Sequence, residues 1–183
     1  SFSPDGSLLA ITHDKKLAVY DFASGEKLKE IPNILSLPEF NSDGSRLLAL
    51  ASNRPTIVSI FDTDSWKVIQ TIQMPELQKV DYAPDGQRVI GILAAENPSL
   101  SLWDVNSATE IGRVADQYKY LWSVQFTPDG KYIISAGMED DQDLGGLAVW
   151  DVETREKVAS LFSMESFSRI SFTPDGKYFI TTD

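Results

Sequence analysis

Short runs of mainly apolar residues alternate with polar turn residues along the whole chain. Five such runs each follow a glycine-containing turn, at residues 8–11, 47–50, 89–93, 132–134 and 178–180. They are rich in Val, Ile, Leu and aromatic residues, and the polar stretches that separate the runs leave no room for a helix. Runs of this length and composition, bounded by turn residues, predict β-strands. We therefore expect an all-β fold.

The turns that precede these runs share one sequence pattern. They read SPDG, NSDG, APDG, TPDG and TPDG, and they end at Gly6, Gly44, Gly86, Gly130 and Gly176. Proline fixes φ at about −65° at the first turn position, and glycine accepts the positive φ that a bulged hairpin needs. Each turn therefore predicts a hairpin. The glycines are 38, 42, 44 and 46 residues apart, which is a mean repeat of 42.5 residues.

Other positions match from repeat to repeat. An aromatic residue stands two positions before the Pro or Ser of each turn: Phe2, Phe40, Tyr82, Phe126 and Phe172. A second apolar run ends in an aromatic residue followed by aspartate, at Asp21, Asp62, Asp104 and Asp151. This aspartate opens the next turn, where its carboxylate can accept backbone N–H groups. Each complete repeat therefore predicts four short strands.

A period near 42 residues with four strands and a closing aromatic-Asp pair is typical of a propeller blade. On these motifs the whole chain resembles the WD-repeat β-propellers and their bacterial YVTN-type relatives. The resemblance implies one propeller domain over 1–183, with four-stranded antiparallel blades at about 1–31, 34–72, 77–115 and 120–162, and half a blade at 167–183. WD-repeat proteins usually carry a Gly-His pair before the innermost strand, whereas the single histidine of this chain, His13, lies elsewhere.

The number of blades raises the question of how the ring closes. Propellers typically contain about 4 to 8 blades, and four and a half blades do not close a ring. We expect the chain to be part of a longer propeller, because a seven-bladed ring with this repeat needs about 300 residues. The alternative is that the end strands pair, so that four blades close with one overlapping hairpin.

The length of the loops varies at one end of the blades. Because neighbouring strands run in opposite directions, the second-to-third and blade-to-blade loops share the end opposite the hairpin turns. The separation between the turn glycine and the aromatic-Asp pair grows from 15 to 18, 18 and 21 residues, so the second-to-third loop lengthens. Loops on a rigid scaffold are where binding residues usually lie. We predict a partner-binding surface there, formed by His13, Arg54, Glu96, Tyr118, Tyr120, Met164 and Phe167.

Two features of this predicted surface have a second interpretation. Its apolar side chains could instead seal neighbouring blades, although Tyr, Met and Arg are typical of interface centres. The acidic loop 139–143, with Glu139, Asp141 and Asp143, could ligate calcium, which takes about 6 to 8 oxygens. Because the loop lacks the spacing and the closing bidentate Glu of an EF-hand, we favour a solvated acidic loop. We predict no metal and no cofactor.

Composition and charge narrow the class of partner. The chain of 183 residues, with 42% hydrophobic and 23% charged residues, has the composition of a globular protein, and no stretch approaches the roughly 20 apolar residues of a membrane span. The net charge of −11, with only 16 Lys and Arg, argues against nucleic acid and anionic lipid as partners. Nine of the 27 acids are aspartates of the two turn motifs. Most of the excess of acidic over basic residues therefore follows from turn formation.

Candidate catalytic residues are few. With one histidine and no cysteine, the chain cannot assemble a His-rich or Cys-rich zinc site, and a Ser-His-Asp triad would need His13. His13 precedes Asp14 in a short turn, where a surface histidine is ordinary. The resemblance to WD-repeat proteins therefore implies a non-catalytic scaffold that binds another protein. The alternative, implied by the YVTN-type resemblance, is a ligand- or calcium-dependent propeller enzyme similar to sugar lactonases or dehydrogenases.

Overall fold

The computed structural model describes residues 1–51, 56–94, 98–115, 118–139, 145–162, 169–173 and 176–182. Within these ranges every regular element is a β-strand, and the strands pair in sheets that follow their order in the chain. The prediction of an all-β fold with four-stranded antiparallel sheets is confirmed. In this part of the chain, no helix that could span a membrane is found. The chain divides into two compact units.

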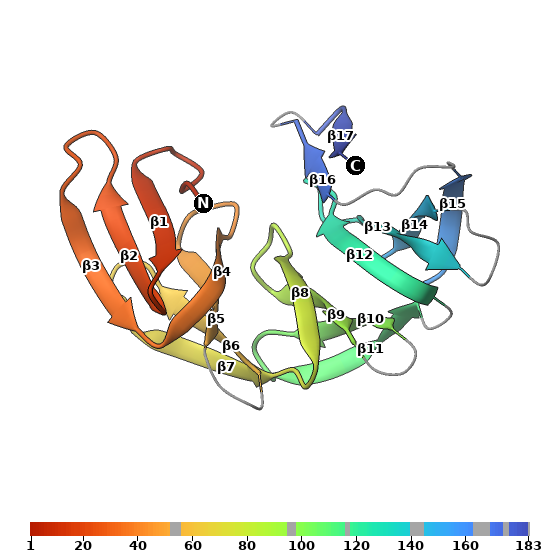
Figure 1. Ribbon diagram of the computed structural model, residues 1–183, viewed down its shortest axis with the longest axis horizontal. Helices are drawn as coiled ribbons and strands as arrows, with labels where there is room; N and C mark the ends of the chain where they lie inside the picture. The colour runs from red at the N-terminus through yellow and green to blue at the C-terminus, as the bar shows by residue number, and fades with distance from the viewer. Residues whose placement is uncertain are drawn as a thin grey trace. The chain divides into compact units, whose positions relative to one another are not determined.

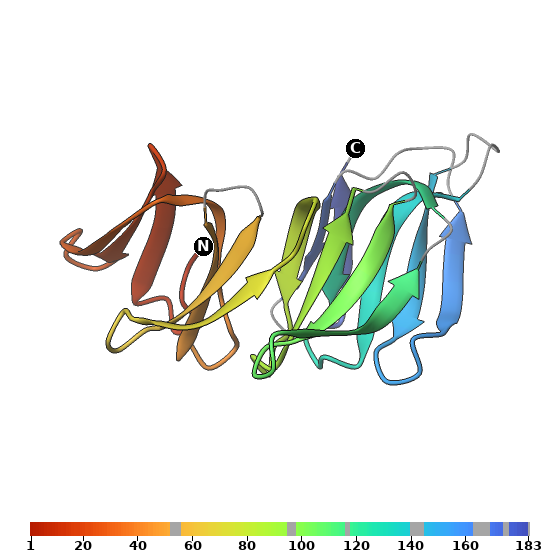
Figure 2. The ribbon, with the colours of Figure 1, turned by 90° about the horizontal axis from the view of Figure 1, so that it is seen from below.

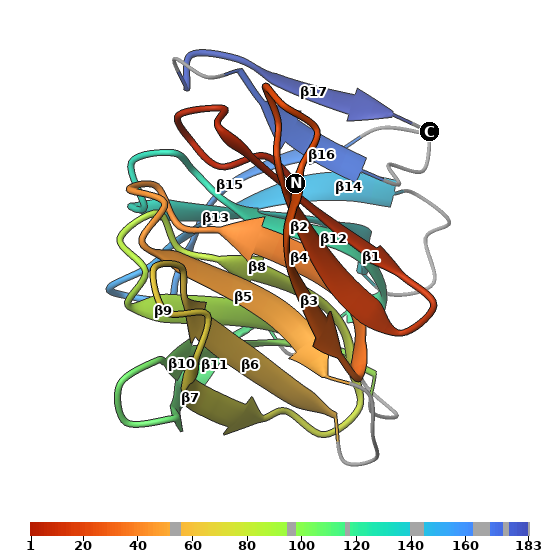
Figure 3. The ribbon, with the colours of Figure 1, turned by 90° about the vertical axis from the view of Figure 1, so that its left-hand side faces the viewer.

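The first unit contains residues 1–75, 85–87 and 105–109. Sheet one is made of β1 (Leu8–His13), β2 (Lys16–Asp21) and β3 (Lys27–Pro32) (Figure 3). Sheet two is made of β4 (Ile34–Phe40), β5 (Arg46–Ala51), β6 (Ile57–Asp62) and β7 (Val68–Gln73). At the β1 edge of sheet one, Phe2 forms an antiparallel bridge with Leu9. The N-terminal residues therefore take the place that β4 has in sheet two.

The second unit contains residues 76–84, 88–104 and 110–183. Sheet three is made of β8 (Leu77–Tyr82), β9 (Arg88–Leu93), β10 (Ser99–Asp104) and β11 (Thr109–Ala115), which lie side by side in Figure 2. Sheet four is made of β12 (Tyr118–Phe126), β13 (Tyr132–Glu139), β14 (Gly145–Asp151) and β15 (Lys157–Phe162). Sheet five is the pair β16 (Arg169–Phe172) and β17 (Phe179–Thr182). That all five sheets form one partial propeller domain stays a prediction.

Each unit has apolar cores between consecutive sheets. In the first unit, Leu17 and Val19 of sheet one share a core with Leu47 and Phe61 of sheet two. In the second unit, side chains of β9 and β10 share a core with side chains of β12, β13 and β14, and β12 also lies against β16 (Figure 1). Burying one large aliphatic or aromatic side chain contributes about 1.5–3 kcal/mol. Because a sheet buries apolar side chains only against its neighbours, the repeats stabilise one another.

The hairpin turns also stack between sheets. Gly44 and Gly176 both have a positive φ, at 74° and 68°, as the turn sequence predicts. A Cβ atom added at Gly176 would lie 3.3 Å from Pro128, the proline of the preceding turn, and one added at Gly44 would lie 3.4 Å from Pro4. The glycine is therefore required both for its backbone conformation and because the proline of the previous repeat packs against it.

The aspartate of each aromatic-Asp pair organises the second turn. The Asp21 carboxylate accepts hydrogen bonds from the backbone N–H and the hydroxyl of Ser24, and the Asp62 carboxylate accepts the same pair from Ser65. The fifth residue of this turn has a left-handed backbone, with φ of 72° at Gly25 and 55° at Ala108. The predicted turn chemistry is thus present, at both turns of a repeat. We call the end of a sheet that carries these turns the turn end, and the opposite end the loop end.

A buried carboxylate connects two sheets of the second unit. Asp81 is 6% exposed and lies on β8, and its Oδ2 accepts a hydrogen bond of 2.6 Å from the backbone N–H of Phe126 on β12. Both strands are the first of their sheets, where one edge has no strand partner in its own sheet. A side-chain acceptor from the preceding sheet therefore satisfies an edge N–H that would otherwise be left unpaired.

Candidate functional site

The loop end of sheet four carries the best-described part of the predicted surface. Strands β12 and β13 pair so that Tyr118 lies opposite Glu139 and Tyr120 opposite Met138. The register shifts between Tyr118 and Tyr120, as at a β-bulge. Bulges bend a strand and re-aim its side chains. The strand that carries both predicted tyrosines therefore begins with an irregular pairing, at the end of the sheet where β13 ends and β14 begins.

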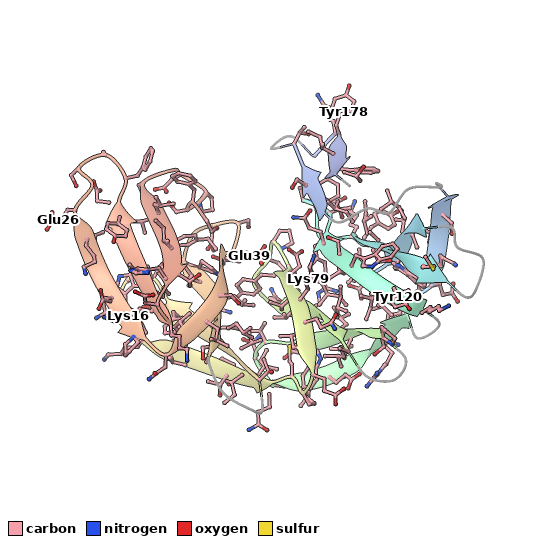
Figure 4. All side chains as sticks on the ribbon, in the orientation of Figure 1. Lys16, Glu26, Glu39, Lys79, Tyr120 and Tyr178 are labelled. Atoms are coloured by element: carbon pink, nitrogen blue, oxygen red, sulfur yellow. The ribbon has the colours of Figure 1, made fainter. Side chains whose placement is uncertain are left out.

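Tyr120 is a candidate binding side chain because it is large, half-exposed and next to a cation. Tyr120 lies on β12 (Figure 4), and its exposed fraction is 50%. The Nζ of Lys119 lies 5.9 Å from the centroid of the Tyr120 ring. A cation over a tyrosine ring at an exposed site contributes about 0.5–1 kcal/mol, which biases the orientation of both side chains. Tyrosine is favoured at interfaces because its ring supplies contact area and its hydroxyl a hydrogen bond.

His13 lies in the first unit, at the end of β1. Asp14 and Lys15 form a two-residue hairpin with positive φ at both residues, 49° and 58°. The His13 Nδ1 lies 3.2 Å from the Asp14 Oδ2, and the two side chains are 74% and 81% exposed. Such an open position fits a surface contact, whereas a general base normally lies in a partly enclosed site. His13 and Tyr120 belong to different units and are separate candidates.

Several predicted positions lie outside the described residues. These are Arg54, Glu96, Met164, Phe167 and, in the acidic loop, Asp141 and Asp143. The backbones of Tyr118 and Glu139 belong to β12 and β13, but their side chains are also outside the description. Among the described residues, no three His, Asp or Glu side chains lie close enough together to hold a metal ion. The choice between a calcium site and a solvated loop at 139–143 therefore stays a prediction.

The carboxylates at the turn end accept hydrogen bonds from other residues of the same turns. Hydrogen bonds from the Ser3 hydroxyl and from Ser7 lower the pKa of Asp5 to about 2. Hydrogen bonds from Ser24 and Thr127 lower the pKa values of Asp21 and Asp129 in the same direction. A carboxylate that accepts several hydrogen bonds is stabilised in its charged form. These contacts support the interpretation that much of the net charge of −11 comes from turn formation.

Two notable side chains were not among the predicted site residues. Lys119 stands between the two predicted tyrosines, so its adjacency to them in the sequence is the signal that could have identified it. Asp81 immediately precedes the repeated aromatic residue Tyr82, and Glu39 and Gln125 occupy the same position in their repeats. A recurrent polar residue immediately before the repeated aromatic residue could have indicated a contact between sheets.

Comparison with known proteins identifies the family. Residues 92–183, half of the chain, match the family described as eukaryotic translation initiation factor eIF2A, a family of WD-repeat propellers. The chain belongs to this family. The resemblance to WD-repeat β-propellers that the sequence motifs indicated is confirmed.

Two individual proteins are similar to most of this chain. An uncharacterized WD repeat-containing protein of Synechocystis, sll1491, is 25% identical over 144 residues, which are 75% of this chain and 40% of that protein. Human apoptotic protease-activating factor 1 is 24% identical over 160 residues, 78% of this chain and 12% of that protein. The chain thus spans less than half the length of these relatives.

A solved structure shows the same fold. The β-propeller domain of Myceliophteria thermophila Cps50 (Swd1) superposes with a TM-score of 0.80 at 16% identity, over 99% of this chain and 62% of that one. At this identity the likeness concerns the fold alone. The comparison therefore supports a β-propeller fold and carries no information on what the chain binds.

Proposed function

We propose that this chain is a non-catalytic protein-interaction scaffold, which binds a partner protein through the loop end of its sheets. The observation that carries the proposal is the half-exposed Tyr120 beside Lys119 at the loop end of sheet four. The relationship to WD-repeat propellers supports it, because such domains hold variable loops on a rigid scaffold. The turn end offers less freedom, since its side chains are hydrogen-bonded within the turns.

The proposal defines a binding surface that a site-specific probe can test. A photo-reactive amino acid in place of Tyr120, in the full-length protein in its source cells, should cross-link to a discrete partner protein. The same amino acid in place of Tyr132 is a matched control. Tyr132 is the first residue of β13, opposite Asp151 at the turn end of the same sheet, and is 37% exposed. Cross-linking of the same partner with equal yield from both positions would contradict the proposal.

Affinity measurements with the purified partner then test the energetics. Truncating a tyrosine at the centre of an interface typically costs about 2 kcal/mol, or roughly 30-fold in Kd. We expect Tyr120→Ala to weaken binding by about this factor and Tyr132→Ala to leave Kd unchanged. Equal affinities of wild type and Tyr120→Ala would remove Tyr120 from the proposed surface.

The effect of calcium on the Tm of the purified protein tests the catalytic alternative. A calcium-dependent enzyme must bind calcium in its native state, and binding to the native state raises Tm. We expect calcium to leave Tm unchanged. A Tm that rises with calcium concentration, and stops rising when Asp141 and Asp143 are replaced by Asn, would support the calcium-dependent alternative.

A further inference from the structure

Sheets three and four each carry a tryptophan at the equivalent position, but the indole N–H groups of the two tryptophans differ in their hydrogen bonding. In sheet four, the Nε1 of Trp150 donates a buried hydrogen bond of 2.9 Å to the Oγ of Ser135. In sheet three, the Nε1 of Trp103 is buried and has no hydrogen-bond partner within the described part of the chain. A buried N–H group without an acceptor is costly and therefore calls for an explanation.

The register of the two sheets shows which group has changed. In sheet four, Ser135 pairs with Ala148, two residues before Trp150. In sheet three, Gly91 pairs with Ser101, two residues before Trp103. Gly91 thus holds the position of Ser135, and Ser101 holds the position of Ala148. The hydroxyl that satisfies the indole in sheet four lies on the opposite strand in sheet three.

The displaced hydroxyl does not satisfy the indole. Side chains directly opposite in an antiparallel pair have Cβ atoms about 4.5–5.5 Å apart, so the exchange moves the hydroxyl by more than a hydrogen-bond length. Ser101 is 0% exposed, and its Oγ also has no partner within the described part of the chain. Residues 101 and 103 lie on one face of β10, and residue 91 faces them from β9. Two unsatisfied polar atoms therefore lie on one face, beside a glycine.

We propose that one water molecule is bound beside Gly91 and bridges the Nε1 of Trp103 and the Oγ of Ser101. The indole is only a donor, so the water oxygen accepts from it, and a water O–H donates to the serine oxygen. The CH2–OH group that glycine lacks relative to serine is similar in size to a water molecule, whose share of the liquid is about 30 Å³. The water would thus replace the hydroxyl that Ser135 supplies in sheet four.

A crystal structure at a resolution of about 1.8 Å or better tests the site directly, because buried waters with two or more polar partners are well ordered. We expect a solvent peak at about 3 Å from both atoms. In Gly91→Ser, the peak should disappear and the introduced hydroxyl should accept from Trp103. A direct hydrogen bond between Ser101 and Trp103, or no solvent peak in the wild-type protein, would overturn the proposal.

A double-mutant cycle tests the site in solution, whether or not Gly91→Ser folds. Removing a satisfied hydroxyl destabilises, whereas removing an unsatisfied one is neutral or stabilising. We therefore expect Ser101→Ala to lower Tm, by about 2–4 °C for a chain of this size. The loss should shrink in the Trp103→Phe background, because both side chains bind the same water. A Tm that does not fall, or additive effects of the two substitutions, would contradict a shared water.

Discussion

The two ends of sheet four differ in what their side chains do. At the turn end, the Oδ1 of Asp129 accepts hydrogen bonds from the Thr127 hydroxyl and the Lys131 N–H, at 2.6 and 3.1 Å. The Asp151 carboxylate accepts from the N–H of Thr154 at 2.8 Å. At the loop end, the ring of Tyr120 is half exposed and contacts the cation of its own neighbour, Lys119.

The difference shows how a repeat separates folding from binding. Turn-end side chains satisfy backbone groups, so a substitution there removes hydrogen bonds that the fold needs. The same turn sequences recur because each repeat has the same backbone to satisfy. An exposed loop-end side chain has no such task, so substitutions there usually change stability by less than about 0.5 kcal/mol. The loop end is therefore where a partner surface can vary at little cost in stability.

Acid should have the largest effect, because protonation acts on several turns at once. Hydrogen bonds lower the pKa values of Asp5, Asp43, Asp62, Asp129 and Asp151, and that of Asp5 falls from 3.8 to about 2. A depressed folded-state pKa contributes stability that is present above the unfolded value. We expect the free energy of unfolding to fall as pH decreases from about 4 to about 2, measured by urea unfolding at several pH values.

A substitution in one turn tests whether the turn carboxylates cause this loss of stability in acid. Asp129→Asn removes one titrating carboxylate, so its stability should decrease less steeply over the same pH range. A wild-type protein whose stability is constant between about pH 4 and 2 would show that the turn carboxylates do not contribute.

The second largest effect concerns the hydrogen bond between the Asp81 carboxylate and the backbone N–H of Phe126, at the turn end of β12. Asp81→Ala leaves the buried N–H of Phe126 without its acceptor, and we expect a loss of about 1–3 kcal/mol in the free energy of unfolding. Asp81→Asn retains an oxygen acceptor at this position and should lose less. Chemical denaturation of both variants measures the difference, with Tyr120→Ala as the loop-end control. A loss at Tyr120 equal to that at Asp81 would break the contrast between the two ends.

The smallest effect is a stabilisation at a turn of the first unit. Ala108 has a φ of 55°, at the turn position that Gly25 occupies in sheet one. A left-handed backbone costs a residue with a Cβ roughly 1–2 kcal/mol, and glycine loses about 0.5–1 kcal/mol more entropy on folding. We expect Ala108→Gly to stabilise by about 0.5 kcal/mol and Gly25→Ala to destabilise, as measured by thermal unfolding. Destabilisation by Ala108→Gly would show that the Ala108 methyl group contributes contacts that outweigh the backbone strain.

The candidate site was less predictable than the fold. Loop lengths pointed to the loop end, but the exposure of Tyr120 and its contact with Lys119 depend on how β12 and β13 pair. The sequence around Trp103 also does not show which residue lies across the sheet from its indole ring. Trp103 and Trp150 both precede an aspartate, yet only the register shows that a glycine lies diagonally across from Trp103 and a serine diagonally across from Trp150.

The sequence by itself determined the strands, their turns and the propeller repeat. Turn chemistry and alternating apolar runs are local properties, and they are repeated often enough along the chain to be recognised without coordinates. Only the tertiary structure decided that Pro128 packs on Gly176 and that Asp81 binds the backbone of Phe126. These contacts join residues 45 or more positions apart, and their partners depend on how neighbouring sheets pack, which no local pattern specifies.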